Sequence, residues 1–333
     1  MAALGPRPLP ALWKCRGKSM ICLAVGKVAG PISGMETSAR LSEPFALTRP
    51  AGPKVPVILT SPHSGRVYPE DFLAASRLNA LSIRRSEDSF VEELFAAGPA
   101  LGMNLLAANF PRAYCDANRE AWELDPEMFE GRLPDYVNTA SPRVTVGLGT
   151  IARIVATGET IYRRKLSFAE AEQRVTRCWQ PFHAKLQALI EVTRQECGSC
   201  LVIDCHSMPR AVPEATAARQ ANVILGDGYG TACTPKITAF VEGTLQRLGF
   251  TVGRNDPYAG GYITRHYGQP RHHVHVLQIE VARALYMDER RLEKTPDFAA
   301  VSGRLQEFLS CLAESVRFLL PPDEGWRVAS AAE

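Results

Sequence analysis

The 333-residue sequence has no apolar run long enough to cross a membrane, and neither sign of charge dominates it. It has 38 Lys and Arg residues against 35 Asp and Glu residues, and the basic residues are spread along the chain. A membrane span needs about 18 or more consecutive apolar residues, and a nucleic-acid-binding protein usually carries a basic patch. We therefore expect neither a membrane partner nor a nucleic-acid partner.

The nine cysteines lack the regular spacing of a disulfide framework. An odd number of unevenly spaced cysteines suits a reducing compartment better than a secreted scaffold. Cys197 and Cys200 form a C-x-x-C pair, but the sequence has no second pair to complete a four-thiolate zinc site. Ser64 and Ser207 lie outside any G-x-S-x-G motif, which argues against a serine hydrolase. We interpret the cysteines as buried, reduced structural residues.

The composition is that of an ordinary globular protein, with 46% hydrophobic and 22% charged residues. Residues 1–34 contain five basic residues, several prolines and no acid, so we predict a disordered N-terminal extension, with a targeting segment as the alternative. Residues 35–325 are predicted to form a single α/β domain, and residues 326–333 a frayed tail. Apolar strand patterns alternate with helical ones in this domain, which predicts a βαβ architecture with helices on both faces of a sheet.

Two predicted strands are each followed by a histidine. The run from Val55 to Thr60 stops at Ser61-Pro62 and continues into His63, and the run 201–203 continues into His206. In an open α/β sheet, ligands bind beyond the carboxyl ends of the strands. The two histidines are therefore candidate metal ligands at one edge of a sheet.

An acidic residue would complete this candidate site. Asp88 or Glu87, at the start of the predicted helix after the first strand, could supply the third ligand, and Ser86 is the predicted cap of that helix. Two histidines and one carboxylate leave a position for water, which is the pattern of catalytic zinc. Asp204 lies two residues before His206, so both side chains are expected to face one side of a strand, where the acid can orient the imidazole.

Glu280 is the candidate proton acceptor, because it lies near the end of the apolar strand 277–281. A charge in such a strand is costly unless it is paired or used. The alternative is an ion pair between Glu280 and Arg283. Arg112, Arg119 and Arg265 lie in loops next to strand ends, and a guanidinium binds a carboxylate through two parallel hydrogen bonds. These arginines suggest a small carboxylate-bearing substrate.

Several segments together resemble the N-formylglutamate amidohydrolase (N-formylglutamate deformylase) family. They run in order from about Val55 to Asp288, so the resemblance covers most of the chain and excludes residues 1–34. The matching segments are SPHSGRVYPEDF, RRSEDSFVEELF, FPRAYCDANRE with the following ELDPEMF, VIDCHSMP, GGYITRHYG and the strand Gln278-Ile-Glu280.

The resemblance implies a fold similar to that of zinc exopeptidases, a three-layer α/β/α sandwich with a mixed central sheet. It implies one zinc ion per chain, bound by His63, Asp88 and His206, with Glu280 as general base and acid. Asp88 is preferred to Glu87 because the family's acidic residue precedes a valine by three positions.

The resemblance also implies how substrate binds. Asn118 and Arg119 look like the carboxylate-binding pair of zinc carboxypeptidases, and Arg112 and Arg265 are implied partners of substrate carboxylates or of the developing oxyanion. Asp204 is predicted to orient the imidazole of His206.

The activity implied is hydrolysis of N-formyl-L-glutamate to formate and L-glutamate, which in this family usually belongs to cytoplasmic histidine degradation. The alternatives are an amidase for another N-acyl or N-formimino amino acid and a noncatalytic protein that binds small acids on the same fold.

Overall fold

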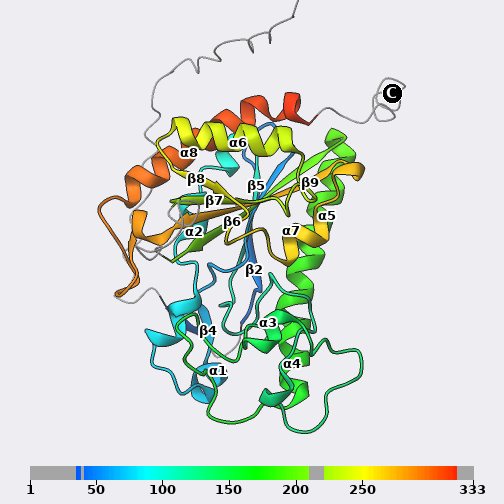
Figure 1. The fold of residues 1–333 in the computed structure, drawn as a ribbon, viewed down its shortest axis with the longest axis vertical. Coiled ribbons are helices and arrows are strands. Elements are labelled where there is room, and N and C mark those ends of the chain that lie inside the picture. The colour runs from blue at the N-terminus through cyan, green and yellow to red at the C-terminus, as the bar shows by residue number, and fades with distance from the viewer. Residues whose placement is uncertain (1–34, 39–40, 210–220, 321–333) are drawn as a thin grey trace, which may run out of the picture. The chain divides into compact units, whose positions relative to one another are not determined.

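A mixed sheet of seven strands lies at the centre of the part of the chain that the structure describes (Figure 1). The computed structural model describes residues 35–38, 41–209 and 221–320. The strand order is β2-β5-β3-β6-β9-β7-β8. The strands are β2 (Phe45–Thr48), β3 (Val57–Ser61), β5 (Asn104–Ala108), β6 (Cys200–Met208), β7 (Val223–Gly226), β8 (Val252–Arg254) and β9 (Val274–Ala282).

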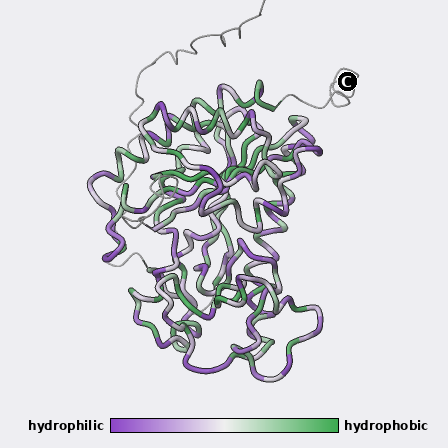
Figure 2. The backbone as a smooth tube through the Cα atoms, in the orientation of Figure 1, coloured by the Kyte–Doolittle hydropathy of each residue, from purple (hydrophilic) through white to green (hydrophobic). Residues whose placement is uncertain are grey.

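The neighbouring strands β5, β3, β6 and β9 run parallel to one another. β2 and β7 run antiparallel to the outer members of this group, and β8 is parallel to β7. Every residue of β3, β6 and β9 is buried, which explains their near-continuous apolar sequences (Figure 2). Because parallel strands end at the same edge, the segments after β3 and β5 and the last residues of β6 and β9 come together there.

Helices cover both faces of the sheet, so the predicted three-layer α/β/α sandwich with a mixed central sheet is confirmed (Figure 1). Leu201, Ile203 and Cys205 of β6 pack with one helical layer, and Val202 packs with the other. The first layer contains α2 (Val91–Leu94), α6 (Pro235–Arg247) and α8 (Phe298–Leu319). The second contains α5 (Gln180–Cys197) and α7 (Tyr262–Tyr267).

A second group of elements extends beyond the carboxyl edge of the sheet (Figure 1). Most of it comes from the long segment between β5 and α5, which contains only short helices. Its apolar side chains, such as Leu124 and Met128, are nevertheless buried in the core cluster shared with α5. The elements are β1 (Glu36–Ser38), β4 (Val67–Pro69), α1 (Glu70–Ala75), η1 (Ser82–Ser86), η3 (Pro126–Met128), α3 (Pro142–Thr145) and α4 (Phe168–Arg174).

The remaining elements are short connections. They are η2 (Pro99–Leu101), the π-helical turn η4 (Val175–Trp179), η6 (Pro270–His272), η7 (Arg283–Leu285), β10 (Met287–Asp288) and β11 (Glu293–Lys294). The π-helical turn η4 joins α4 to α5 just before Pro181.

The helix predicted to begin at Ser86 begins instead at Val91, so the predicted cap is wrong. The Ser86 hydroxyl accepts a hydrogen bond from the backbone N–H of Ala156. The backbone N–H of Asp88 donates to the carbonyl of His63 at 3.0 Å. Residues 87–90 therefore run alongside the segment after β3, and the helix starts only after them. This path places Asp88 beside His63.

Among the described residues, no helix is long and apolar enough to cross a membrane. No disulfide joins the cysteines that the structure describes, and most of them are buried as predicted, whereas Cys197 and Cys311 are partly exposed. The predictions for residues 1–34 and 326–333 lie outside the described residues.

Candidate active site

His63, Asp88 and His206 meet at the carboxyl edge of the sheet, with ligand-type atoms all within 4.8 Å of one another. His63 follows β3, Asp88 precedes α2, and His206 lies within β6, which extends further than the predicted strand 201–203. The Oδ2 atom of Asp88 lies 3.3 Å from Nδ1 of His63 and 3.0 Å from Nδ1 of His206. All three side chains are buried.

Each imidazole has a second carboxylate on its far side. Nε2 of His63 lies 2.7 Å from Oδ1 of Asp116, and Nε2 of His206 lies 3.0 Å from Oδ2 of Asp204. A carboxylate accepts a hydrogen bond, so it favours the tautomer with the proton on Nε2 and the lone pair on Nδ1. Both histidines are thus arranged to present Nδ1 as a ligand atom.

These outer carboxylates are themselves held by hydrogen bonds. Arg112 donates from Nε and Nη2 to Oδ2 of Asp116, at 3.2 and 2.9 Å. The hydroxyl of Thr60 donates to Oδ1 of Asp204 at 2.7 Å. Burial raises the pKa of Asp116, but Arg112 and His63 outweigh it and hold that pKa well below its usual value. Asp116 therefore stays ionised behind His63.

Asp88 also contacts Arg283. Nη2 of Arg283 donates to Oδ1 of Asp88 at 2.9 Å, and its Nε donates to the hydroxyl of Ser207 at 3.0 Å. The ion pair between Arg283 and Glu280, weighed from the sequence as an alternative, is replaced by this pair with Asp88. Arg283 therefore fixes one oxygen of Asp88 and leaves the other facing the two histidines.

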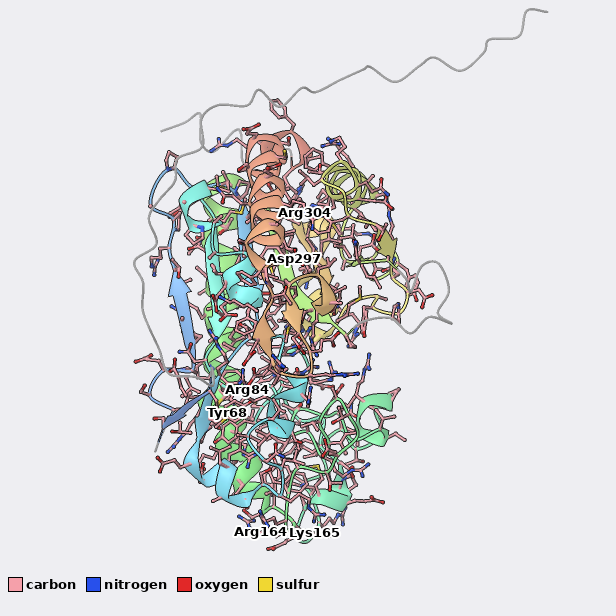
Figure 3. All side chains as sticks on the ribbon, turned by 90° about the vertical axis from the view of Figure 1, so that its left-hand side faces the viewer. Tyr68, Arg84, Arg164, Lys165, Asp297 and Arg304 are labelled. Atoms are coloured by element: carbon pink, nitrogen blue, oxygen red, sulfur yellow. The ribbon has the colours of Figure 1, made fainter. Side chains whose placement is uncertain are left out.

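Glu87, the other acid considered from the sequence, belongs to a different network. Its carboxylate accepts hydrogen bonds from Tyr68, Arg84 and Ser89. Figure 3 labels Tyr68 and Arg84, which lie close together beyond the carboxyl edge of the sheet. The geometry thus brings Asp88, and not Glu87, into the cluster with the histidines.

The residues present fit a bound cation. Nδ1 of His63 is buried and has no hydrogen-bond partner among the described residues. Burial lowers the pKa of His206, but Asp204 and Asp88 outweigh it and raise that pKa well above its usual value. The cluster therefore favours positive charge between its side chains. Two imidazole nitrogens and a carboxylate oxygen are a ligand set that suits zinc.

Glu280 lies beside this cluster on β9, directly across from His206 on β6. Burial raises its pKa to about 7, helped by Asp88 and opposed by His206, Arg112 and Arg283. A carboxyl group with a pKa near neutrality can both accept and return a proton. Nε2 of Gln278 donates to Oε1 of Glu280 at 2.9 Å.

The arginines predicted to bind substrate differ in their exposure and in their hydrogen-bond partners. Nε of Arg119 donates to the carbonyl of Leu148 and its Nη1 to that of Asn118. Arg265, on α7, is exposed and donates to the carbonyl of Gly260. Arg112 directs two nitrogens at Asp116 and keeps a partly exposed side chain.

Asn118 is placed between the cluster and α7 rather than in a loop open to substrate. Its Nδ2 lies 3.1 Å from Nε2 of His206 and 3.3 Å from Oδ2 of Asp204, and its Oδ1 accepts from the backbone N–H of Ile263. A carboxylate-binding role for Asn118 stays a prediction, and it would compete with these contacts.

Sequence reasoning missed roles for Asp116 and Gln278, and it weighed Arg283 only as a partner of Glu280. Asp116 stands two residues before Asn118 in a loop rich in acids, and nothing in that run distinguishes it from its neighbours. Gln278 shares a face of the strand with Glu280 because it lies two residues earlier, and this spacing was the available signal.

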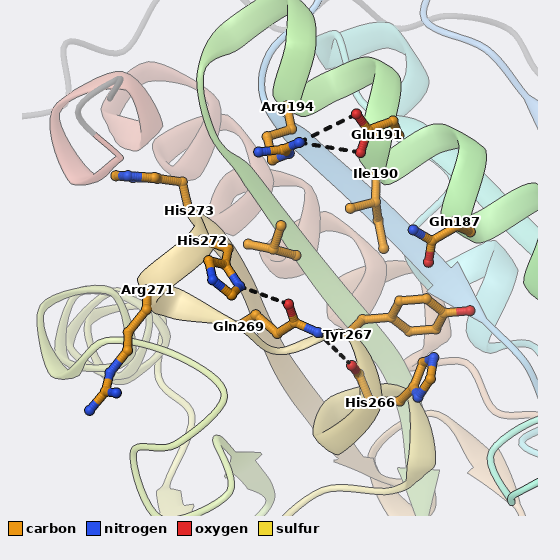
Figure 4. A pocket seen from close by; sticks show the side chains of 11 residues that line it. Gln187, Ile190, Glu191, Arg194, His266, Tyr267, Gln269, Arg271, His272 and His273 are labelled. Atoms are coloured by element: carbon orange, nitrogen blue, oxygen red, sulfur yellow. Dashed lines mark hydrogen bonds and ion pairs between the residues drawn. The ribbon is translucent and has the colours of Figure 1, made fainter. Parts of the chain in front are cut away.

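A separate surface cavity of about 380 Å³ lies between α5 and the segment from the end of α7 to the start of β9 (Figure 4). Two of its polar pairs are Arg194 with Glu191 and His272 with Gln269. It is lined by Val274, the first residue of β9, whereas Glu280 lies near the other end of that strand. The cavity is therefore distinct from the cluster at the carboxyl edge.

A three-layer α/β/α fold that holds a buried His-Asp-His cluster beside a carboxyl group of raised pKa defines a hydrolase with a candidate metal centre. The sequence model of the N-formylglutamate amidohydrolase family matches residues 55–287. The chain belongs to this family of hydrolases that act on an amide, as the sequence motifs predicted.

Known proteins agree with this assignment. The chain is 29% identical over 242 residues to an N-formylglutamate deformylase from Pseudomonas aeruginosa, which covers 71% of this chain and 84% of the relative. It is 26% identical over 239 residues to one from Pseudomonas putida, covering 71% and 83%. The crystal structure of N-formylglutamate amidohydrolase from Ralstonia eutropha JMP134 superposes with a TM-score of 0.77 at 36% identity, covering 82% of this chain and 98% of that one.

Proposed function

We propose that this protein hydrolyses N-formyl-L-glutamate to formate and L-glutamate, with a zinc ion held by His63, Asp88 and His206. The observation that carries the proposal is the pair of Nδ1 atoms facing one oxygen of Asp88, with Glu280 directly across the sheet from His206. The family assignment and the deformylase names of the two Pseudomonas relatives support the substrate.

The chain's own residues supply the proton transfers of the proposed reaction. When bound, zinc supplies Lewis acidity to a carbonyl oxygen and to a water molecule. Glu280 accepts a proton as water attacks the formyl carbon, and it passes that proton to the amide nitrogen as the C–N bond breaks. The products are formate and the free amine of glutamate. The pKa of about 7 suits Glu280 to both steps.

Arginines hold the substrate in this proposal. N-formylglutamate carries two carboxylates, and Arg119 and Arg265 are proposed to bind them with help from Arg112 and Asn118. A guanidinium grips a carboxylate in a fixed direction, so the small formyl group is presented to the cluster in a reactive orientation. Asp204 and Asp116 hold His206 and His63 during turnover. The enzyme would then act in cytoplasmic histidine degradation, as the resemblance implies.

The proposal is tested by metal analysis of the purified full-length protein and by formate release from a panel of amides. We expect one zinc per chain and preferred turnover of N-formyl-L-glutamate over N-formyl-L-alanine, which lacks the side-chain carboxylate. Preferred turnover of an N-acetyl or N-formimino amino acid would instead favour the alternative amidase. Bound zinc without hydrolysis of any N-acyl amino acid would favour the noncatalytic binding protein.

A further inference from the structure

Gln278 lies next to Glu280 on the face of β9 that carries the site, and its side chain is buried. Cross-strand register places it beside Asp204, as Glu280 lies beside His206. Its two amide atoms make different contacts. Nε2 donates to Oε1 of Glu280 at 2.9 Å, and Oε1 accepts from the backbone N–H of Gly261 at 2.8 Å.

The contact with Gly261 fixes which way the amide points. A backbone N–H can only donate, so it must face the oxygen of the amide and not its nitrogen. The nitrogen of Gln278 is therefore directed at Glu280. Because the amide nitrogen can only donate, Oε1 of Glu280 is the acceptor of this contact, and Oε2 is the oxygen that Gln278 leaves open.

The local backbone holds Gly261 in reach of Gln278. Gly226 on β7 pairs with Gln278. A Cβ at Gly226 would lie 2.8 Å from the backbone of residues 258–260. The absence of a side chain at Gly226 thus lets the loop before α7 lie against the sheet. The same loop leads into the first turn of α7, where Asn118 accepts from Ile263.

We propose that Gln278 is a positioning residue for the reaction, which orients the carboxylate of Glu280 and anchors it to the backbone at the start of α7. The proposal rests on the role of Glu280 in the proposed function. Among the described residues, Gln278 provides the side-chain hydrogen bond to this carboxylate. With Oε1 occupied, Oε2 is the atom that takes the proton from water and returns it to the leaving nitrogen.

Two variants separate this role from a structural one. Gln278→Glu keeps an acceptor for the N–H of Gly261, but it replaces the amide donor with a second carboxyl group. The two carboxyl groups then either repel each other or share the proton that Glu280 has to transfer. Gln278→Met keeps the volume and removes both contacts. We expect kcat to fall about 10- to 100-fold in both variants, since a misplaced catalytic group costs about that much. In Gln278→Glu, KM should stay within about threefold of the wild-type value.

His275→Leu is the matched control, because His275 is a buried polar residue of the same strand whose side chain points to the opposite face. It should leave kcat unchanged. Bound metal and melting temperature, measured for every variant, separate loss of folding from loss of positioning. If only anchoring α7 mattered, Gln278→Glu would keep the wild-type kcat, and that result would overturn the proposal.

Crystal structures of the metal-loaded wild type and of Gln278→Met test the inference independently of any substrate. We expect the carboxylate of Glu280 to turn away or to adopt several conformers in the variant, and an unchanged Glu280 would contradict the positioning role. Failure of the wild type to release formate would refute the proposed function alone, because the position of Glu280 in the two structures still decides the role of Gln278.

Discussion

His63 and His206 present the same ring nitrogen, Nδ1, to a single oxygen of Asp88, although they come from segments 143 residues apart. Each ring reaches this arrangement because a separate carboxylate, Asp116 or Asp204, occupies its Nε2. The pairing is nearly symmetric, with one Asp-His unit on each side of Asp88. Because Asp116 and Asp204 fix the tautomer and the orientation of the two histidines, we expect them to contribute to the affinity for a bound cation.

Asp116→Asn and Asp204→Asn should therefore weaken metal binding without abolishing it. Each variant replaces a full negative charge with an amide that no longer imposes the required tautomer on its histidine. We expect the affinity for zinc to fall about 10- to 100-fold, as for other partners of metal-bound histidines. Competition with a chromophoric chelator measures the affinity directly. Asp135→Asn, in an exposed pair with Arg132, is the control, and equal affinities in all the variants would contradict the prediction.

Glu280→Gln should separate metal binding from turnover. The variant keeps the size of the side chain but cannot accept a proton, and Glu280 is not one of the proposed ligands. We expect one zinc per chain, as in the wild type, and a fall in kcat of about 10²- to 10⁴-fold. Formate release and metal content are measured on the same preparation. Glu293→Gln in β11 is the exposed control, and a Glu280→Gln protein with normal turnover would refute the role of this residue.

The sequence was sufficient to predict the architecture and some of the residues that meet at the sheet edge. His63, His206 and Glu280 could be singled out because each follows or ends an apolar strand, and parallel strands end at a common edge. The cluster of His63, Asp88 and His206 agrees with that expectation. Their roles as ligands and base stay predictions until metal and activity are measured.

The contacts of the site could not be predicted because they depend on which strands are neighbours. Asp116 reaches His63 only because β5 lies beside β3, and Gln278 meets Gly261 only because the loop before α7 crosses Gly226. Arg283 pairs with Asp88, 195 residues away, and not with Glu280, which is close to it in the chain. The predicted helix start at Ser86 failed for a related reason, since the backbone of Asp88 is bonded to that of His63.

Gly65 permits a close approach that positions His63. A Cβ at this residue would lie 2.1 Å from the carbonyl oxygen of Phe110, in the segment that leads to Arg112 and Asp116. Gly65→Ala should push the segments after β3 and β5 apart, lower the free energy of unfolding by about 1–3 kcal/mol, and weaken metal binding. Urea unfolding measures the first effect. Gly52→Ala, with no atom within 4 Å of the added Cβ, is the control. Equal stability of the two variants would show that the protein can accommodate a Cβ between Gly65 and Phe110.

We expect His183 to make the stability of the protein depend on pH in the mildly acidic range. It is buried in α5, with Nε2 2.8 Å from the carbonyl of Ala117 and Nδ1 2.9 Å from the hydroxyl of Tyr267. The carbonyl requires a proton on Nε2, so the neutral ring accepts at Nδ1 from Tyr267. Burial lowers the pKa of His183 to about 4. The folded protein therefore resists protonation at a pH where the unfolded chain, with an ordinary pKa of about 6.5, already binds the proton.

The contribution of His183 to stability is thus fully present above about pH 6.5 and is lost as the pH falls toward about 4. Because the unfolded chain binds one more proton than the folded protein over this pH window, the free energy of unfolding falls by about 3 kcal/mol. His183→Gln keeps a donor for Ala117 and does not titrate, so its unfolding free energy should fall less steeply than that of the wild type between these two pH values. Urea unfolding at a series of pH values gives both slopes. His272→Gln, at an exposed histidine bonded to Gln269, should keep the wild-type slope. If His183→Gln also kept the wild-type slope, the acid sensitivity would arise from other buried groups.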